Sequence, residues 1–190
     1  LNARGESDAQ ALFIRYHDKK IDQKYAPQGD IALNLFNEME QARCEAIGGI
    51  IYPGAAKNIE NNVEKKSKKF FENSEPNKKF PLQDSLTLLI KKKASNLKLS
   101  ENSEKGLKMW EDFILNESKS NFTKIIESIA NQEEFAKLSR NIIKDLGYGD
   151  QLGDDPNKED NAENDNQKDE SNSTENSDEN DNAEQQLPDE

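Results

Sequence analysis

The side chains best suited to nucleophilic or metal chemistry in this chain are a single cysteine, Cys44, and a single histidine, His17. A structural zinc site needs about four clustered cysteine and histidine ligands, and these two residues lie 27 positions apart. Cys44 has no second histidine to activate it, so we expect a small buried or half-buried residue and not a nucleophile. We expect His17 to be a polar packing residue or a surface residue. Phosphate-binding glycine loops and Gly-x-Ser-x-Gly elbows are absent, so the sequence predicts no catalytic, cofactor-binding or metal-binding residue.

Two charged features suggest ligands but fit them poorly. The carboxylates of Asp154, Asp155, Glu159 and Asp160 are hard ligands of the kind that calcium prefers, but the spacing of an EF-hand loop is absent, so we expect only diffuse cation binding. The lysines within residues 65–69 and 91–93 are expected on solvent-exposed helix faces. Few aromatic residues are interleaved with them and the acidic end of the chain would repel phosphate, so no nucleic-acid partner is predicted.

Charge divides the chain into two regions. Residues 148–190 contain 16 acidic residues against two lysines, a net charge of −14, whereas the whole chain has −12; residues 1–147 therefore carry the remaining +2. The acidic region has too little apolar surface to offset about 1–2 kcal/mol of backbone entropy per residue. We therefore expect residues 150–190 to form a disordered acidic linker.

Simple features of the sequence predict the cellular compartment of the protein and whether the chain is a fragment. No apolar run approaches the ~20 residues that cross a bilayer, and a single cysteine excludes an internal disulfide and fits a reducing compartment. We expect a cytoplasmic protein without a membrane partner. Because the chain starts at Leu1 and stops at Glu190 within a charged run, we also expect a fragment of a longer protein.

Helical periodicity dominates residues 30–149, where apolar residues recur every three or four positions. We predict an all-α domain of about six helices there. It is preceded by an N-terminal arm, residues 1–29, which we expect to be short and irregular or strand-like because residues 9–17 alternate only partly. The predicted helices cover approximately residues 30–47, 53–72, 81–93, 101–116, 122–129 and 131–146.

Capping residues set the predicted helix ends. Asp30 is expected to cap the first helix through its carboxylate, and Gly48 and Gly49 to end it. Asn131, with Glu134 three positions later, predicts a capping box at the start of the last helix.

Three stretches of the chain carry a family resemblance. The first comprises residues 3–9 (ARGESDA) and 15–18 (RYHD), the second residues 40–48 (EQARCEAIG) and 53–59 (PGAAKNI), and the third residues 132–136 (QEEFA) and 150–155 (DQLGDD). In this order they resemble the N-terminal region of CobT subunits of aerobic cobaltochelatase, with residues 40–48 the most specific block. Residues 57–105 depart from the family, since they are rich in lysine and asparagine where its members are rich in arginine and alanine.

The resemblance implies a place in aerobic cobalamin synthesis, in the ATP-dependent complex that inserts cobalt into hydrogenobyrinic acid a,c-diamide. In that family a large subunit holds the tetrapyrrole and performs the chelation, and the CobT-type subunit joins a ring-forming AAA+ ATPase. The resemblance thus implies a non-catalytic part of an oligomeric ligase complex that uses ATP, magnesium and cobalt, while this chain binds none of them. The family's C-terminal von Willebrand-type metal-adhesion domain is missing from residues 1–190.

Four charged residues, Arg4, Glu40, Arg43 and Glu45, are candidates for the interface with other subunits. An intramolecular salt bridge that holds the N-terminal arm to the first helix is an equal alternative. The function has an alternative too: an acidic-tailed helical interaction protein, or chaperone of basic partners, whose binding is lost at high salt.

Overall fold

Helices account for most of the computed structural model, which describes residues 2–95 and 98–156. These residues contain eight α-helices and two short helical turns and no strand, so the all-α prediction is confirmed for them. The elements are α1 (Asn2–Tyr16), α2 (Lys19–Tyr25), α3 (Asp30–Ile51), α4 (Pro53–Asn73), α5 (Leu82–Ser95), α6 (Glu101–Lys108), α7 (Glu111–Glu127), α8 (Gln132–Ile143), η1 (Lys144–Tyr148) and η2 (Gly149–Gln151).

The chain divides into two units, Leu1–Asp154 and Asp155–Glu190. The helices named above all belong to the first unit. Most of the predicted disordered linker, residues 157–190, lies outside the described residues.

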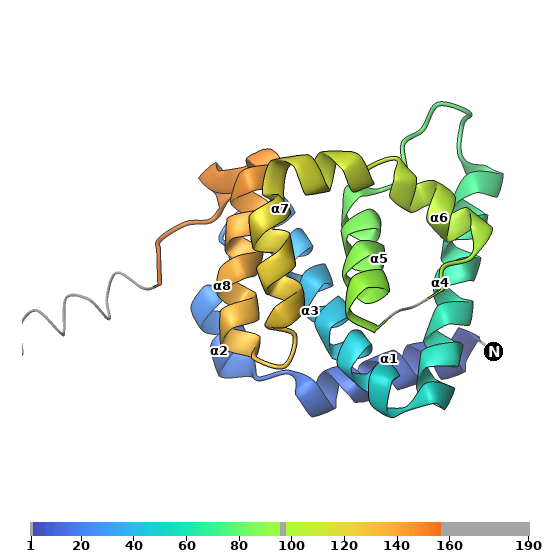
Figure 1. Ribbon diagram of the computed structural model, residues 1–190, viewed down its shortest axis with the longest axis horizontal. Helices are drawn as coiled ribbons and strands as arrows, with labels where there is room; N and C mark the ends of the chain where they lie inside the picture. Colours follow the sequence, from blue (N-terminus) through green and yellow to red (C-terminus); the bar gives the residue numbers. More distant parts are fainter. Residues whose placement is uncertain (1, 96–97, 157–190) are drawn as a thin grey trace, which may run out of the picture. The chain divides into compact units, whose positions relative to one another are not determined.

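Helix α3 is the centre of the first unit. It packs against α5, α1, α4 and α8 (Figure 1). Its apolar residues are spaced three or four apart, and Ala32, Leu35, Phe36, Met39 and Ala42 are all buried as a result. Helix α5 contributes Leu86, Leu89 and Ile90 to the same core. No helix among the described residues is both long and apolar enough to cross a bilayer.

The predicted N-terminal arm is wrong, because residues 2–25 form α1 and α2. Helix α1 packs on α4 and α3 through a face that recurs at helical spacing, namely Gly5, Ala9, Leu12 and Tyr16. Only Gly5 and Leu12 on that face are buried. Since half of the face is glycine and alanine, its apolar stripe is too thin to distinguish a helix from an irregular segment by periodicity.

The predicted end of α3 is also wrong, since Gly48 and Gly49 lie inside the helix. Gly48 is buried where α1 crosses α3, and an added Cβ would overlap the side chain of Leu12. This glycine therefore permits a close helix crossing and does not serve as a C-cap.

The predicted count of six helices is too low because the two N-terminal helices are additional. Within residues 101–129 two helices are present as predicted but their boundaries differ, since the predicted helix over 101–116 is divided at Met109–Trp110 into α6 and α7. Helix α7 then continues through the predicted gap to Glu127, with a kink at Ser118 (φ −134°, ψ 33°). The last predicted start is confirmed: Asn131 caps α8, and its side chain accepts a hydrogen bond from the backbone N–H of Glu134.

Candidate functional site

A buried ion pair on α3 joins three segments of the chain. Arg43 donates to both carboxylate oxygens of Glu40, from Nε at 2.7 Å and from Nη2 at 2.8 Å. The same guanidinium donates to the backbone carbonyls of Tyr16, at the end of α1, and of Ile129, in the turn before α8. Because Arg43 is 2% exposed and Glu40 4% exposed, each charge depends on the other for compensation.

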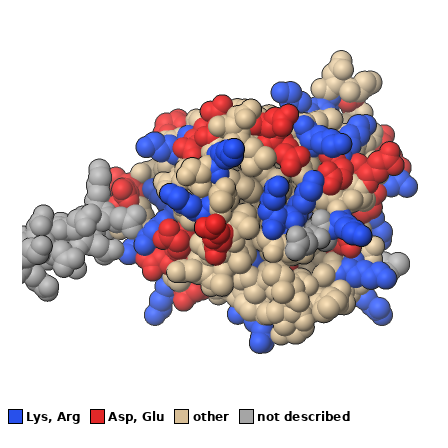
Figure 2. All heavy atoms as spheres, in the orientation of Figure 1, with Lys and Arg blue, Asp and Glu red and all other residues tan. Residues whose placement is uncertain are grey.

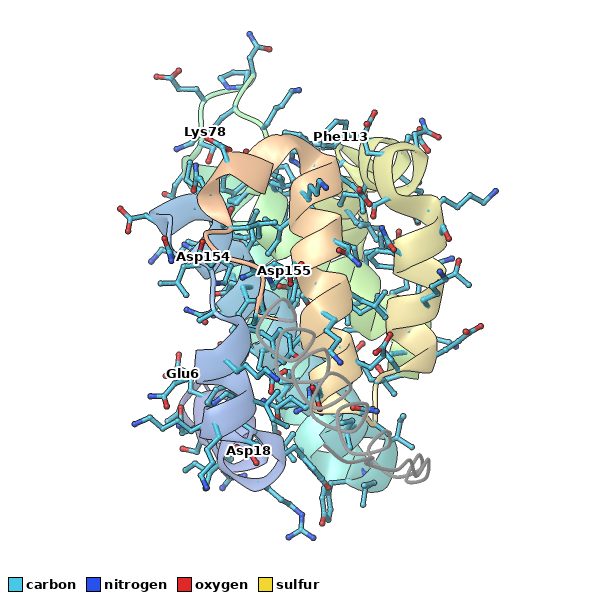
Figure 3. All side chains as sticks on the ribbon, turned by 90° about the vertical axis from the view of Figure 1, so that its left-hand side faces the viewer. Glu6, Asp18, Lys78, Phe113, Asp154 and Asp155 are labelled. Carbon is cyan, nitrogen blue, oxygen red and sulfur yellow. The ribbon has the colours of Figure 1, made fainter. Side chains whose placement is uncertain are left out.

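Polar side chains extend this ion pair on both sides. The Nδ1 atom of His17 lies 3.1 Å from Glu40 Oε1. The Oε1 atom of Gln132 accepts from Arg43 Nη2 and from the backbone N–H of Asp18, and its Nε2 donates to the Asp18 carbonyl. Asp18 lies in the turn between α1 and α2 (Figure 3) and caps α2 by accepting from the Lys20 amide. We call the set Arg43, Glu40, His17 and Gln132 the buried lock.

A second buried ion pair joins α3 to α5. Lys91 Nζ lies 2.7 Å from Glu45 Oε2, and the two side chains are 5% and 9% exposed. Gln41 Nε2 donates to the other oxygen of Glu45 at 2.8 Å. Burial opposes ionisation of this carboxyl, but the charge and hydrogen bond of Lys91, helped by Gln41 and Lys66, lower the pKa of Glu45 below its ordinary value.

The four predicted interface residues therefore occupy different environments. Glu40 and Arg43 are buried in one ion pair, Glu45 is held by Lys91, and Arg4 is exposed in the first turn of α1. The structure brings Glu40 and Arg43 together and separates Arg4 from them by the length of α1. Any contribution of the two buried residues to an interface is therefore indirect, through the positions of α1, α3 and α8.

Gln151 caps the N-terminus of α3, so the predicted capping by Asp30 is wrong. The Oε1 atom of Gln151 accepts from the backbone N–H groups of Ile31 and Ala32, each at 3.1 Å, while Asp30 is the first residue of the helix and is exposed. Gly29 precedes the helix, and an added Cβ there would approach Gln151 Cβ to 2.6 Å. The partner is 120 positions distant, so no local capping signal identifies it.

The two residues first considered for chemistry are both used in packing. His17 is half-buried in the lock and stacks on Phe13 with ring centroids 4.2 Å apart. Cys44 is fully buried, and burial together with the nearby Glu40 raises the pKa of its thiol to about 12. In residues 2–95 and 98–156, histidine, cysteine and carboxylate side chains form no group of three or more suited to a metal ion.

Two surface features have the chemistry of binding sites. A pocket of about 340 Å³ lies between α1, α3, α4 and α5. An uncharged corner lies where α3 meets α4: residues 46–56 contain no charged side chain, and Ile50, Ile51 and Tyr52 are 60%, 53% and 40% exposed. Figure 2 shows this corner as a continuous surface free of Lys, Arg, Asp and Glu.

The comparison with protein families decides where this arrangement belongs. The family model described as cobalamin biosynthesis protein CobT matches residues 1–190. The chain is a member of the CobT family. Membership assigns it to cobalamin biosynthesis. No solved structure matches the chain.

The stretches that resemble CobT subunits meet in the folded chain. His17, Glu40, Arg43 and Gln132, which form the lock, come from all three of them. Asp8 of the first stretch accepts from Asn58 Nδ2 of the second at 2.8 Å. In this CobT chain the most specific sequence block, residues 40–48, is thus the segment that organises the packing of α1, α5 and α8 around α3.

Proposed function

We propose that this chain is a non-catalytic subunit region of the ATP-dependent cobaltochelatase, which inserts cobalt into hydrogenobyrinic acid a,c-diamide in aerobic cobalamin biosynthesis. The chain acts by assembling with an AAA+ ATPase subunit, and the complex also includes a large tetrapyrrole-binding subunit. ATP, magnesium and the cobalt substrate are handled by those partners. The observation that carries the proposal is the match of the CobT family model to residues 1–190.

The distribution of charge in the first unit supports a role in assembly. The Glu45–Lys91 pair joins α3 to α5, and Arg43, paired with Glu40 on α3, donates to backbone carbonyls at the end of α1 and before α8, so these buried charges are used in internal packing. The exposed apolar residues Ile50, Ile51 and Tyr52 occupy the uncharged corner, whereas about a third of the whole chain is charged. Exposed apolar surface of this kind marks protein–protein contacts, so we assign the ATPase contact to this corner.

The test is co-purification of the tagged chain with the AAA+ ATPase subunit in the presence of magnesium and ATP. We expect the wild-type chain to retain the ATPase and the Ile50→Ser/Ile51→Ser/Tyr52→Ser variant to lose it. Phe113→Ser is the matched control, because Phe113 is 39% exposed on α7, outside the corner (Figure 3).

The results test separately the assembly with the ATPase and the position of the contact. A wild-type chain that does not retain the ATPase refutes assembly, and a triple variant that retains it as well as wild type refutes the assignment to the corner. Circular dichroism establishes that the variants keep their helices. Binding to unrelated basic proteins that disappears at high salt would instead favour the acidic-tailed interaction protein.

A further inference from the structure

The pocket between α1, α3, α4 and α5 has an apolar wall and an acidic wall. Ile59, Val63 and Phe70 from α4 line it together with Phe80 and Leu88. Phe70 and Phe80 meet edge to face with ring centroids 5.1 Å apart. Its volume of about 340 Å³ lies at the lower end of the range for small-ligand sites, roughly 300–1,000 Å³. The pocket therefore suits one side chain or a molecule of similar size.

The charges around the pocket do not balance. Its lining includes four carboxylates, Glu6, Glu38, Glu45 and Asp84, and two ammonium groups, Lys66 and Lys91. Glu45 and Lys91 compensate one another in their buried pair. Three carboxylates then face the single charge of Lys66, so the pocket has an excess of two negative charges.

The pKa of Glu38 reflects this excess of negative charge. Burial, with the nearby charge of Asp84 adding to it, raises the pKa of the Glu38 carboxyl above its ordinary value. No ion-pair partner lies within 4.0 Å of Glu38 or Asp84 among the residues that the structure describes. A cation placed between these carboxylates would relieve the repulsion and stabilise both ionised forms.

The shape of the two walls selects the kind of cation. A guanidinium is planar, can donate to two carboxylates at once, and packs its flat face and aliphatic stem against aromatic and aliphatic groups. An ammonium is a compact and strongly hydrated charge that makes less use of such a wall. The arrangement of Phe70 and Phe80 beside Glu38 and Asp84 therefore fits arginine better than lysine.

We propose that this pocket binds the arginine side chain of a partner polypeptide, with Glu38 and Asp84 accepting from the guanidinium and the apolar wall holding its stem. The inference rests on the proposed function only for the origin of that arginine, which we assign to another subunit of the complex. The pocket is lined by α1, α3, α4 and α5 and includes none of Ile50, Ile51 and Tyr52, so it is a contact separate from the uncharged corner.

The experiment uses the ¹⁵N-labelled chain of residues 1–190 and a capped pentapeptide, Gly-Leu-Arg-Leu-Gly. The control peptide replaces arginine with citrulline, which has nearly the same shape without the charge. We expect saturable shifts of the backbone amides around the pocket with the arginine peptide, and at least tenfold weaker binding of the citrulline peptide. The Glu38→Gln/Asp84→Asn variant is expected to bind the arginine peptide at least tenfold more weakly, and Glu117→Gln, on the exposed surface of α7, to bind it as wild type does.

Three results would overturn the inference: no saturable shift at the pocket with the arginine peptide, equal binding of the citrulline peptide, or unchanged binding by the double variant. Thermal melting of the double variant shows whether its fold is kept. Because the titration contains no other subunit, its failure leaves the proposed assembly standing. Failure of co-purification with the ATPase likewise leaves the chemistry of the pocket standing.

Discussion

Replacing Arg43 with alanine should strongly destabilise the first unit. The change removes the bidentate contact with Glu40 and leaves that carboxylate buried beside a half-buried histidine. It also removes the donors to the carbonyls of Tyr16 and Ile129 and to the side chain of Gln132. The turns that hold α1 and α8 against α3 lose their common partner.

The size of the effect follows from the burial of the pair. Removal of one member of a buried ion pair costs about 3–5 kcal/mol, because the remaining charge is uncompensated. Domains of this size have a free energy of unfolding of about 5–15 kcal/mol. For a domain of this length each kcal/mol corresponds to about 2–4 °C in Tm, so we expect Arg43→Ala to lower Tm by about 6–20 °C.

Urea denaturation followed by circular dichroism measures this loss on the chain of residues 1–190. Arg4→Ala is the control, because Arg4 is exposed and its removal should change the free energy of unfolding by no more than about 0.5 kcal/mol. A second variant, Arg43→Met/Glu40→Met, removes both charges and should lose less stability than Arg43→Ala, since no uncompensated carboxylate remains.

The reasoning is refuted if Arg43→Ala lowers the free energy of unfolding by less than about 1 kcal/mol, which is the range of a surface ion pair. It is also refuted if the double variant is less stable than the single one, because the cost would then come from lost packing and not from the orphaned charge. If Arg43→Ala retains its stability but no longer co-purifies with the ATPase subunit, Arg43 acts at an interface as first predicted from the sequence.

Four further predictions concern single positions. Gln151→Ala removes the acceptor at the start of α3 and should lower the free energy of unfolding by about 1 kcal/mol, measured by urea denaturation. Gly48→Ala should be destabilising despite a gain of about 1 kcal/mol in helix propensity, because its Cβ would overlap α1. Gly54→Ala is the control and should be neutral or stabilising, because nothing lies within 4 Å of an added Cβ there. Equal effects of the two substitutions on the free energy of unfolding would contradict the packing argument. The thiol of Cys44, buried and with its pKa raised to about 12, should resist iodoacetamide at pH 8 in the native chain and react in urea; rapid native labelling would show local opening. The pKa of Glu45 is lowered in the folded chain, so its ionised form stabilises the fold above the ordinary glutamate pKa of about 4.3. This stabilisation is lost as the pH falls through the pKa that Glu45 has in the folded chain. The free energy of unfolding should therefore depend less steeply on pH in that range in Glu45→Gln than in wild type.

The sequence predicts well those helices whose buried face is a clear stripe of apolar side chains. Helices α3, α4, α5 and α8 begin within a residue or so of their predicted starts, because each has an amphipathic apolar stripe, and Asn131 caps α8 as predicted. Helix α1 is missed because its inner face is made partly of glycine and alanine. Small side chains on such a face let the helix backbone lie close to its neighbours, but they give little hydrophobic periodicity in the sequence.

The difference between local patterns and long-range packing also explains which residues of the candidate site can be predicted from the sequence. The spacing of Glu40 and Arg43 indicates that they can pair on one turn of a helix, but it does not indicate whether the pair faces solvent or a neighbouring helix. That is decided by Tyr16, Ile129 and Gln132, which are 27, 86 and 89 positions from Arg43. These contacts exist only after α1 and α8 have packed on α3, so no local pattern encodes them.

The unbalanced charges of the pocket follow from the same packing. Glu38 lies on α3, Asp84 on α5 and Glu6 on α1, and each would be an ordinary solvated carboxylate on an isolated helix. They become a site because the lock and the Glu45–Lys91 pair draw these helices together, while the available lysines are too few to compensate them. Residues of one CobT sequence block, 40–48, contribute to both ion pairs. Glu40 and Arg43 do not line the pocket, so their substitution should alter partner binding by moving helices and not by removing direct contacts. A change in binding of the arginine peptide by Arg43→Ala, which does not line the pocket, would show this coupling directly, and unchanged affinity in the folded variant would exclude it.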